Sequence, residues 1–368
     1  MMFKLKVYSS ILAVAFSLVA CGGGSDSGNA KSPVASVAAP SIEATSYLNM
    51  KKVRADQIKF TTAGISAWAL GDFLQDKTAS VFFAEPPSSL GSTTKSEFVI
   101  SKLDTAGNLS RVQSFAGCQH PRKAVTADFN HDGLPDIFVA CHGADVAPYP
   151  GAVSKLLMSG SGGLQIKDFS AQAASFTHGA AAADIDGDGW ADLALVNGTN
   201  KISFFQNRGG NSWTPMTVTV DNLQDVSTIY SIEIVDVDGD GWLDILVGGH
   251  DSAKILFGNS AHEFGQRFLQ IPTVSGRAVV LDFTVITSGT TRYLWVNRTS
   301  DSSSSLGFYH SRTLQTVNLT TGRGTVAIDI DSGDTWNPNT QWTPWLLPNR
   351  DDSVSPFDMP SQMYRLNR

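Results

Sequence analysis

The chain has 368 residues, which is enough for two or three ordinary domains or for one large all-β domain. Its net charge of −7 argues against a nucleic-acid binder, which would show a basic stripe, and its three cysteines are too few for a disulfide scaffold or a structural zinc module. The 42% hydrophobic content, 33 glycines and 15 prolines indicate a globular protein with many turns.

The first 20 residues have the features of an export signal. Lys4 and Lys6 precede an apolar run from Ile11 to Ala20, which is too short to span a bilayer. The run ends in Leu18-Val-Ala-Cys21, which resembles the lipobox of bacterial lipoproteins. The resemblance implies that Cys21 is acylated and becomes the first residue of the mature protein. It also favours the outer membrane, because Gly22 rather than an aspartate follows the cysteine.

The next segment is rich in Gly, Ser, Ala and Pro and shows little hydrophobic periodicity up to about Ser46. Such a composition is typical of a flexible linker. We therefore expect a signal peptide in residues 1–20, a tether with the lipidated Cys21 in residues 21–46, and one folded domain in residues 47–368.

Three nine-residue segments that align without gaps organise this domain. They are Asp128-Phe-Asn-His-Asp-Gly-Leu-Pro-Asp136, Asp184-Ile-Asp-Gly-Asp-Gly-Trp-Ala-Asp192 and Asp236-Val-Asp-Gly-Asp-Gly-Trp-Leu-Asp244. Short apolar runs flank each segment, and two further strand-like runs follow. Four short strands in a repeat of about fifty residues predict a β-propeller with four-stranded antiparallel blades.

Weaker copies of the same unit are marked by Asp72, Asp282 and Asp329, each of which follows a short apolar run. The last copy has strand-like runs at Trp345–Leu347 and Met363–Leu366 and lacks a fourth, whereas Val53–Phe60 offers a spare strand near the start. Circular sheets close when one terminus supplies the missing strand of the other, since this removes an exposed edge. We expect six blades closed by the N-terminal strand, with seven as the alternative.

Each acidic segment offers oxygen atoms at a density that suits a hard cation. Positions 1, 3, 5 and 9 carry carboxylate or amide side chains, and position 7 offers a backbone carbonyl. Ca²⁺ takes six to eight such oxygens. An EF-hand is excluded because Val139, Leu195 and Val247 stand where its bidentate glutamate would be needed.

The acidic segments resemble the calcium-binding FG-GAP/VCBS repeats of integrin-α-type β-propellers, strongly in three units and weakly in three others. The resemblance implies about three Ca²⁺ sites that stabilise the blade hairpins, with direct ligand recognition through calcium as the lesser alternative. The first site departs from the pattern at Asn130 and His131, so we expect it to bind more weakly. The implied ligands, through a backbone carbonyl at the leucine and the two tryptophans, are Asp128, Asn130, Asp132, Leu134, Asp136, Asp184, Asp186, Asp188, Trp190, Asp192, Asp236, Asp238, Asp240, Trp242 and Asp244.

Four histidines lie at similar distances from these segments: His120 and His178 before them, His142 and His250 after them. Six strand residues span roughly 20 Å, so these side chains should lie at the opposite end of the blades. They are interpreted as structural histidines, as part of a ligand pocket, or as a second metal or hydrolytic centre. The candidate ligand rim consists of His120, Arg122, His142, Asp145 and His178.

Two cysteines, Cys118 and Cys141, flank the first acidic segment. In an exported protein they favour a disulfide, which requires a bend at Pro121 to bring Cys118 into register. Zinc bound by these cysteines with His120 and His142 is an alternative, as are free thiols.

No segment resembles a nucleophile elbow, a metallopeptidase helix or a dinucleotide-binding loop. The sequence therefore favours a monomeric binding or adhesion module, lipid-anchored in the bacterial cell envelope, whose ligand is an extracellular glycan or protein and not a nucleic acid. The alternative is an extracellular enzyme that acts on envelope or polymeric substrates through the histidine-bearing rim.

Overall fold

The computed structural model describes residues 53–54, 67–78, 80–84, 91–103, 109–250, 252–288, 291–299, 312–320 and 326–331. All of them belong to the compact unit Pro40–Arg368. The expected signal peptide, the acylated Cys21 and the tether lie outside the described residues. No helix within these ranges is long and apolar enough to cross a membrane.

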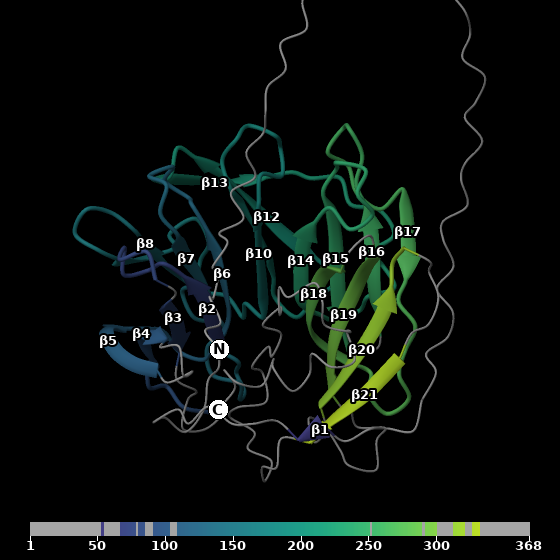
Figure 1. The fold of residues 1–368 in the computed structure, drawn as a ribbon, viewed down its shortest axis with the longest axis horizontal. Helices are drawn as coiled ribbons and strands as arrows, with labels where there is room; N and C mark the ends of the chain where they lie inside the picture. The colour runs from purple at the N-terminus through teal and green to yellow at the C-terminus, as the bar shows by residue number, and fades with distance from the viewer. Residues whose placement is uncertain are drawn as a thin grey trace, which may run out of the picture. The chain divides into compact units, whose positions relative to one another are not determined.

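The described chain is all-β and forms five sheets, each with four antiparallel strands in chain order (Figure 1). The strands of blades 1 and 2 are β2 (Ala67–Gly71), β3 (Ser80–Ala84), β4 (Glu97–Leu103) and β5 (Leu109–Ala116), then β6 (Pro121–Ala127), β7 (Asp136–Cys141), β8 (Lys155–Met158) and β9 (Gln165–Asp168).

Blades 3, 4 and 5 repeat the same order of strands. Their strands are β10 (Gly179–Ala183), β11 (Asp192–Val196), β12 (Ile202–Arg208) and β13 (Ser212–Met216), then β14 (Ile229–Val235), β15 (Asp244–Gly249), β16 (Ala253–Phe257) and β17 (Arg267–Gln270), and finally β18 (Val279–Ser288), β19 (Thr291–Thr299), β20 (Arg312–Asn318) and β21 (Val326–Asp331).

The first strand of each blade is the innermost one. These strands contact one another in sequence, β2 with β6, β6 with β10, β10 with β14 and β14 with β18. Lys123 on β6 and Asp282 on β18 form an ion pair at 2.7 Å although they are 159 residues apart in the chain. The innermost strands of blades 2 and 5 therefore converge on one axis, as the propeller architecture requires.

The core lies between the blades. Along β7, Ile137 and Val139 pack into a cluster shared with blade 1, whereas Phe138 and Ala140 pack into a cluster shared with blade 3. Because successive side chains point to opposite faces, a strand buried on both faces must be apolar throughout. This explains why the strands after the acidic segments read as short continuous apolar runs.

The expected number of blades was wrong, because the described residues form five blades and not six or seven. The run marked by Asp329 is β21, which pairs with β20 as the fourth strand of blade 5. It was taken for the first strand of a sixth unit because an outer strand can carry the same short apolar run as an inner one. The runs at Trp345–Leu347 and Met363–Leu366 lie outside the described residues.

The N-terminal strand does join the last sheet, although differently from the expectation. β1 (Val53–Arg54) pairs with β21 in parallel and adds a fifth strand to blade 5 (Figure 1). It covers the edge of a sheet that already has four strands of its own, so it does not supply a missing fourth strand. The rest of the spare strand, at residues 55–60, lies outside the described residues.

Candidate functional site: acidic loops and axial pocket

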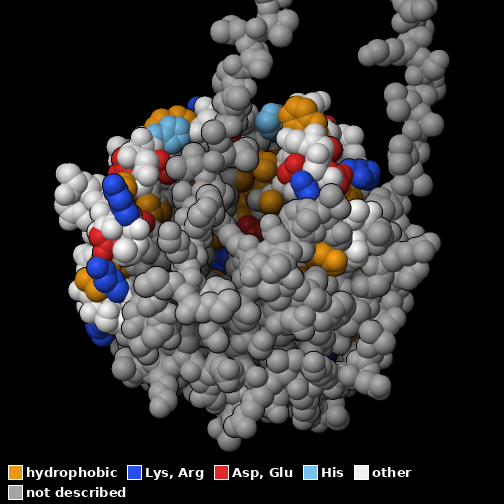
Figure 2. All heavy atoms as spheres, in the orientation of Figure 1, with side chains coloured by type: hydrophobic (Ala, Val, Ile, Leu, Met, Phe, Trp, Pro, Cys, Tyr) orange, Lys and Arg blue, Asp and Glu red, His pale blue; other side chains and the backbone are white. Residues whose placement is uncertain are grey.

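The three acidic segments connect the first and second strands of blades 2, 3 and 4. We call them loop one (Asp128–Asp136), loop two (Asp184–Asp192) and loop three (Asp236–Asp244). Histidine, acidic and hydrophobic side chains gather at the upper edge of the described surface in Figure 2.

The last aspartate of each loop is fully buried and ties the hairpin to the third strand of its blade. In loop two, Asp192 accepts hydrogen bonds from the backbone N–H of Ile185 at 3.1 Å and of Asn207 at 2.8 Å. The same pair of contacts is made by Asp136 and Asp244 in the other loops. Burial raises the pKa of Asp192 to about 6 and that of Asp244 to about 7. Each of these aspartates thus joins two backbone amides of its own blade, and Asp136 also accepts a hydrogen bond from Ser159 Oγ.

The eroded loop of blade 1 retains this arrangement with fewer carboxylates. Asp72 accepts the N–H groups of Asp76 and Lys77, as the first aspartate of loop one accepts those of Asp132 and Gly133. Ser80 stands at position 9 and accepts the N–H of Phe73 at 2.9 Å. The conformation of the loop therefore requires only two acidic residues. The additional carboxylates of loops two and three are not needed to form the turn.

Loop two fits a cation best. Its carboxylates at Asp184, Asp186 and Asp188 bring one oxygen each within 4.8 Å of one another. Asp184 Oδ1 is buried and has no hydrogen-bond partner. An unpaired buried carboxylate oxygen beside two further carboxylates is a costly arrangement, which a bound cation relieves. The Nε2 of Gln206 also contacts Asp186 and Asp188.

The polar side chains of loop one are hydrogen-bonded to one another and to Ser159, which follows β8. Asn130 Nδ2 donates to Asp132 Oδ2 at 3.2 Å and to the carbonyl of Ser159 at 3.1 Å. Ser159 Oγ approaches both oxygens of Asp132 at 3.1 Å and lies 2.6 Å from Asp136. These donors replace part of what a cation would provide, in line with the weaker site expected from the sequence.

Loop three combines an acidic cluster of Asp236, Asp238 and Asp244 with two arginines. Arg267 pairs with Asp238, and Arg292 of blade 5 lies 3.5 Å from Asp236 Oδ1. Its carboxylates are thus partly neutralised by the protein itself. Among the described residues, only loops two and three bring three acidic side chains together in this way.

The position-7 residues, whose carbonyls the resemblance assigns as ligands, donate their backbone N–H to the position-5 carboxylate. The backbone N–H of Leu134 donates to Asp132. That of Trp190 donates to Asp188 and that of Trp242 to Asp240, and all three N–O distances are 2.9 Å. The indole of Trp190 stacks on His131 of loop one, with ring centroids 3.7 Å apart. Loops one and two are therefore in direct contact.

Each loop is also fastened by a side chain from the following blade. Asn207 donates to the carbonyl of Phe129 at 2.8 Å, His262 contacts that of Ile185 at 2.9 Å, and Arg292 donates to that of Asp236 at 3.0 Å. The loops thus join neighbouring blades in addition to closing their own hairpins.

The predicted rim residues lie at the other ends of the same strands. His120 precedes β6 and His142 follows β7, whereas loop one joins the opposite ends of these two strands. His142 is fully buried, with Nδ1 3.1 Å from the carbonyl of Gly143 and Nε2 3.1 Å from Nε2 of His178. His120 is also buried and contacts the carbonyl of Ser92 at 3.2 Å.

Arg122 is the charged centre of this region and pairs with Asp145 at 3.2 Å. Burial and then the guanidinium of Arg122 lower the pKa of His120 to about 4. The same causes lower the pKa of His142 and of His178 far below the usual range. The three imidazoles are therefore neutral at physiological pH. The structure brings His142 and His178 together and keeps His120 against Ser92. His250, the fourth histidine, lies next to blade 4, where its N–H bonds the carbonyl of Thr228.

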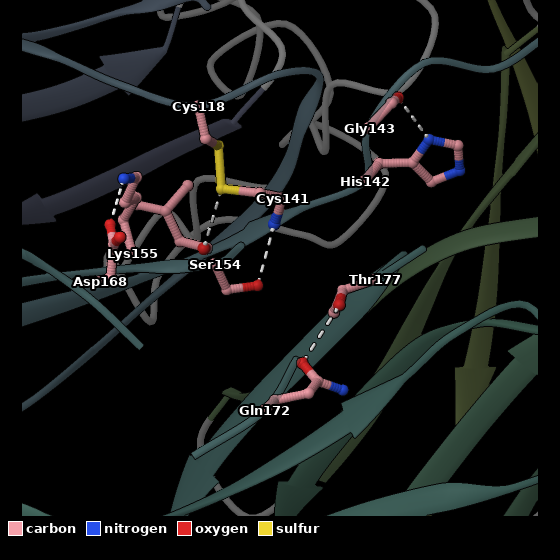
Figure 3. The surroundings of a disulfide bond; sticks show 10 residues. Cys118, Cys141, His142, Gly143, Ser154, Lys155, Asp168, Gln172 and Thr177 are labelled. Carbon is pink, nitrogen blue, oxygen red and sulfur yellow. Dashed lines mark hydrogen bonds and ion pairs between the residues drawn. A yellow bond between two sulfur atoms is a disulfide. The ribbon is translucent and has the colours of Figure 1, made fainter. Parts of the chain in front are cut away.

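Cys118 and Cys141 form a disulfide in the structure, with Cα atoms 6.1 Å apart (Figure 3). A β-bulge between Pro121 and Lys123 provides the change of register that the pairing requires. The disulfide uses both thiols, so the interpretation of this cluster as a zinc site is wrong.

A pocket lies between the innermost strands of blades 2 to 5, and we call it the axial pocket. It is lined by Arg122, Lys123, His178, Gly179, Tyr230, Ser231, Ile232, Leu281 and Asp282. Three of the four strands carry a β-bulge here, and the bulged residues are Arg122, Tyr230 and Leu281. Bulges redirect side chains and are frequent beside functional sites. In this protein all three bulged residues line one pocket.

Sequence reasoning found only Arg122 and His178 among the lining residues. Asp282 was interpreted as the start of an eroded acidic loop, whereas it lies within β18 opposite Asn297. Tyr230 and Leu281 carry no motif, because a bulge depends on how two strands pair. The one available signal was charge: Lys123 and Asp282 are ionisable residues within apolar strands.

The acidic loops lie in a region that matches a known protein family. Residues 128–195 and 184–247 match the family described as FG-GAP-like repeat, and this stretch contains all three acidic loops. No curated protein matches the chain at a significant level.

Several solved structures resemble the chain in fold. The major allergen Mala s 1 of Malassezia sympodialis has a TM-score of 0.44 and 12% identity, covering 64% of this chain and 72% of that chain. BBS1N in complex with ARL6DN has a TM-score of 0.39 and 11% identity, covering 77% and 84%. The Dos1 propeller has a TM-score of 0.38 and 10% identity, covering 75% and 63%. These similarities carry no functional information. The family match shows that the chain contains FG-GAP-like repeats, and its five four-stranded sheets show a β-propeller fold.

Proposed function

We propose that the protein is a binding module: a β-propeller, stabilised by calcium, that holds an extracellular ligand at the histidine-bearing end of its axis. The observation that carries the proposal is the convergence of three bulged residues, Arg122, Tyr230 and Leu281, on the axial pocket. A bulge interrupts the hydrogen bonds between two strands and redirects a side chain. Bulges in three blades around one pocket would present three side chains to a ligand.

Calcium belongs to this proposal as a structural ion. Asp184, Asp186 and Asp188 would hold it in loop two, and Asp236, Asp238 and Asp244 would hold a second ion in loop three. The repeat pattern implies Asp192 and Asp240 as further ligands. When bound, Ca²⁺ supplies positive charge that neutralises the clustered carboxylates. Loop one, whose Asn130 and Ser159 already satisfy its carboxylates, would bind most weakly.

The proposal places the module outside the cytoplasm, tethered by a lipid on Cys21. The lipobox-like Leu18–Cys21 motivates the anchor, and the disulfide between Cys118 and Cys141 supports an oxidising compartment. Cys21→Ser should abolish acylation and release the protein from the membrane fraction. Equal labelling of variant and parent with a fatty-acid analogue would refute the anchor.

A glycan and protein binding array, run with calcium and with chelator, tests the binding function. Tyr230→Ala removes a bulged wall of the axial pocket, and Tyr149→Ala is the matched control because Tyr149 is 57% exposed and does not line the pocket. We expect at least one ligand class to bind the parent and the Tyr149 variant. The same ligand should not bind the Tyr230 variant. Equal binding by all three proteins would show that the ligand site lies elsewhere.

A further inference from the structure

The ion pair between Lys123 and Asp282 holds an amine and a carboxyl group in contact at the axis. Lys123 Nζ lies 2.7 Å from Asp282 Oδ1. Both side chains are largely buried, with exposed fractions of 16% and 8%. The carboxyl carbon of Asp282 is one bond beyond the oxygen that the nitrogen contacts. Two groups that are fixed in this way react as if they were present at a very high local concentration.

A second carboxyl group lies beside this pair. Glu233, on β14 of blade 4, has its Oε2 3.9 Å from Lys123 Nζ. Burial is the main cause that raises the pKa of Glu233 to about 7, and Asp282 raises it further although Lys123 opposes the change. A substantial fraction of Glu233 therefore carries its proton at neutral pH. A distance of 3.9 Å exceeds that of a hydrogen bond, but groups that transfer protons often approach closely only during the reaction.

The other ion pairs of partly or fully buried lysines in the described chain lack this combination. Lys254 Nζ lies 2.8 Å from Asp225, whose side chain is 64% exposed. Lys155 pairs with Asp168, whose side chain is 62% exposed. Water stabilises an exposed carboxylate in its ionised form, which does not react with an amine. Among the described residues, only Lys123 is paired both with a largely buried aspartate and with a second acid.

We propose that Lys123 and Asp282 condense into an intramolecular amide bond, with Glu233 as the residue that transfers the protons. Burial lowers the pKa of Lys123, but Asp282 and Glu233 raise it above its ordinary value, so the reaction starts from the ammonium. The ammonium first passes one proton to the Asp282 carboxylate across their hydrogen bond.

The bond then forms without any co-reactant. The Nζ lone pair attacks Cγ of Asp282, Glu233 gives its proton to the hydroxyl group of Asp282, and the C–O bond breaks. The released water departs into the axial pocket, which Lys123 and Asp282 both line. Glu233 takes the remaining proton from the nitrogen and returns to its starting state. The products are one amide and one water molecule.

This bond joins the innermost strands of blades 2 and 5, whose residues Lys123 and Asp282 are 159 positions apart. It closes a covalent loop that contains the whole of blades 3 and 4. A cross-link over a long loop restricts the unfolded chain and thereby stabilises the folded one. The inference goes beyond the proposed function, because the cross-link strengthens the axis whether or not a ligand binds.

Peptide mapping by mass spectrometry tests the inference on the purified full chain, after reduction and alkylation of its cysteines. An amide at Lys123 blocks tryptic cleavage at this residue. It also joins the peptide with Lys123 to the peptide with Asp282, at a mass that is one water below their sum. We expect this joined peptide to be the main species after the folded protein has been incubated at neutral pH. The peptides that contain Lys254 and Asp225 serve as an internal control and should remain separate.

Four variants separate the amide bond from the ion pair. Lys123→Arg keeps the positive charge but offers no amine, so the joined peptide should be absent. Asp282→Asn should give the same joined peptide, because its side-chain amide can release ammonia instead of water. Glu233→Gln should slow the formation of the joined peptide at least tenfold. Glu263→Gln is the matched control, since Glu263 bonds Gln266, and should leave the rate unchanged.

Separate peptides for Lys123 and Asp282 in the folded parent, after incubation until the masses no longer change, would overturn the inference and leave an ordinary ion pair. A joined peptide in Lys123→Arg would show that the assigned nucleophile is wrong. Equal rates in the parent and a folded Glu233→Gln variant would overturn the role of Glu233. None of these results depends on a ligand, so the proposed binding function stands or falls separately on the array.

Discussion

The acidic loops and the histidine cluster lie at opposite ends of the same strands and handle charge in opposite ways. At the loop end, the buried Asp192 is held by two backbone amides, and the more exposed acids beside it leave Asp184 Oδ1 without a partner. At the other end, His142 is buried and neutral, beside the cationic Arg122. In our proposal the loop end is stabilised by adding a cation, whereas the histidine end is destabilised by adding a proton.

The two ends therefore have separate sources of stability. Loop two depends on amide hydrogen bonds and, in our proposal, on an ion. The histidine end depends on remaining uncharged. The two contributions should therefore respond to different perturbations.

Asp192→Ala should have the largest effect on the loop end. The change leaves the N–H groups of Ile185 and Asn207 without their acceptor, and each unpaired buried group costs about 1–3 kcal/mol. We expect the free energy of unfolding to fall by about 3 kcal/mol, measured by urea denaturation with chelator present. The control is Asp168→Ala, because the Asp168 side chain is 62% exposed and its ion pair with Lys155 should contribute less than about 1 kcal/mol. Equal losses in the two variants would contradict the role assigned to Asp192.

Removal of calcium should have the next largest effect. A ligand at a hundredfold excess over its Kd stabilises the folded state by about 2.7 kcal/mol per site. We expect chelation to lower the melting temperature of the parent. Asp188→Ala or Asp240→Ala should remove more of this response than Asp132→Ala, because Ser159 already bonds Asp132. If metal analysis shows a loaded protein whose melting temperature is unchanged by chelator, calcium does not stabilise the fold.

Acidification should weaken the histidine end. The pKa values of His142 and His178 are lowered in the folded protein, so below pH of about 6.5 the unfolded chain binds more protons than the folded one. The contribution of these two histidines to the free energy of unfolding is then highest above this pH. It falls by about 1.4 kcal/mol per pH unit for each histidine that stays neutral as the pH decreases. His142→Gln should reduce the slope between pH 6.5 and 5, measured with calcium chelated. A slope equal to that of the parent would show that His142 is not the titrating group.

The contact between loops one and two should have the smallest effect. Stacked aromatic pairs contribute about 0.5–1.5 kcal/mol beyond their burial. A double-mutant cycle of His131→Ala and Trp190→Ala should give a coupling energy in this range, because their rings are stacked at 3.7 Å. The cycle of Trp242→Ala and His262→Ala, at 6.3 Å and edge-on, should give a smaller one. A reversed order would mean that stacking does not connect the loops.

Most of the repeat was predictable from the sequence because its signals are local. The three acidic segments place aspartates and glycines at fixed spacing, and positive φ angles at Gly189 and Gly241 fit the turns that these glycines allow. The disulfide between Cys118 and Cys141 was also expected, whereas the bulge that permits it was not recognisable as such.

The sequence by itself thus determined the unit of the fold, a hairpin with an acidic loop followed by two strands, since apolar runs and Asp/Gly turns act within a few residues. The tertiary structure decided the number of blades, because β21 differs from an inner strand only in the strand it pairs with. It also decided the axial pocket, which joins Lys123 to Asp282 across 159 residues and presents Tyr230 through a bulge. Strand register and the convergence of blades around an axis are properties of packing between distant segments, and no short sequence pattern records them.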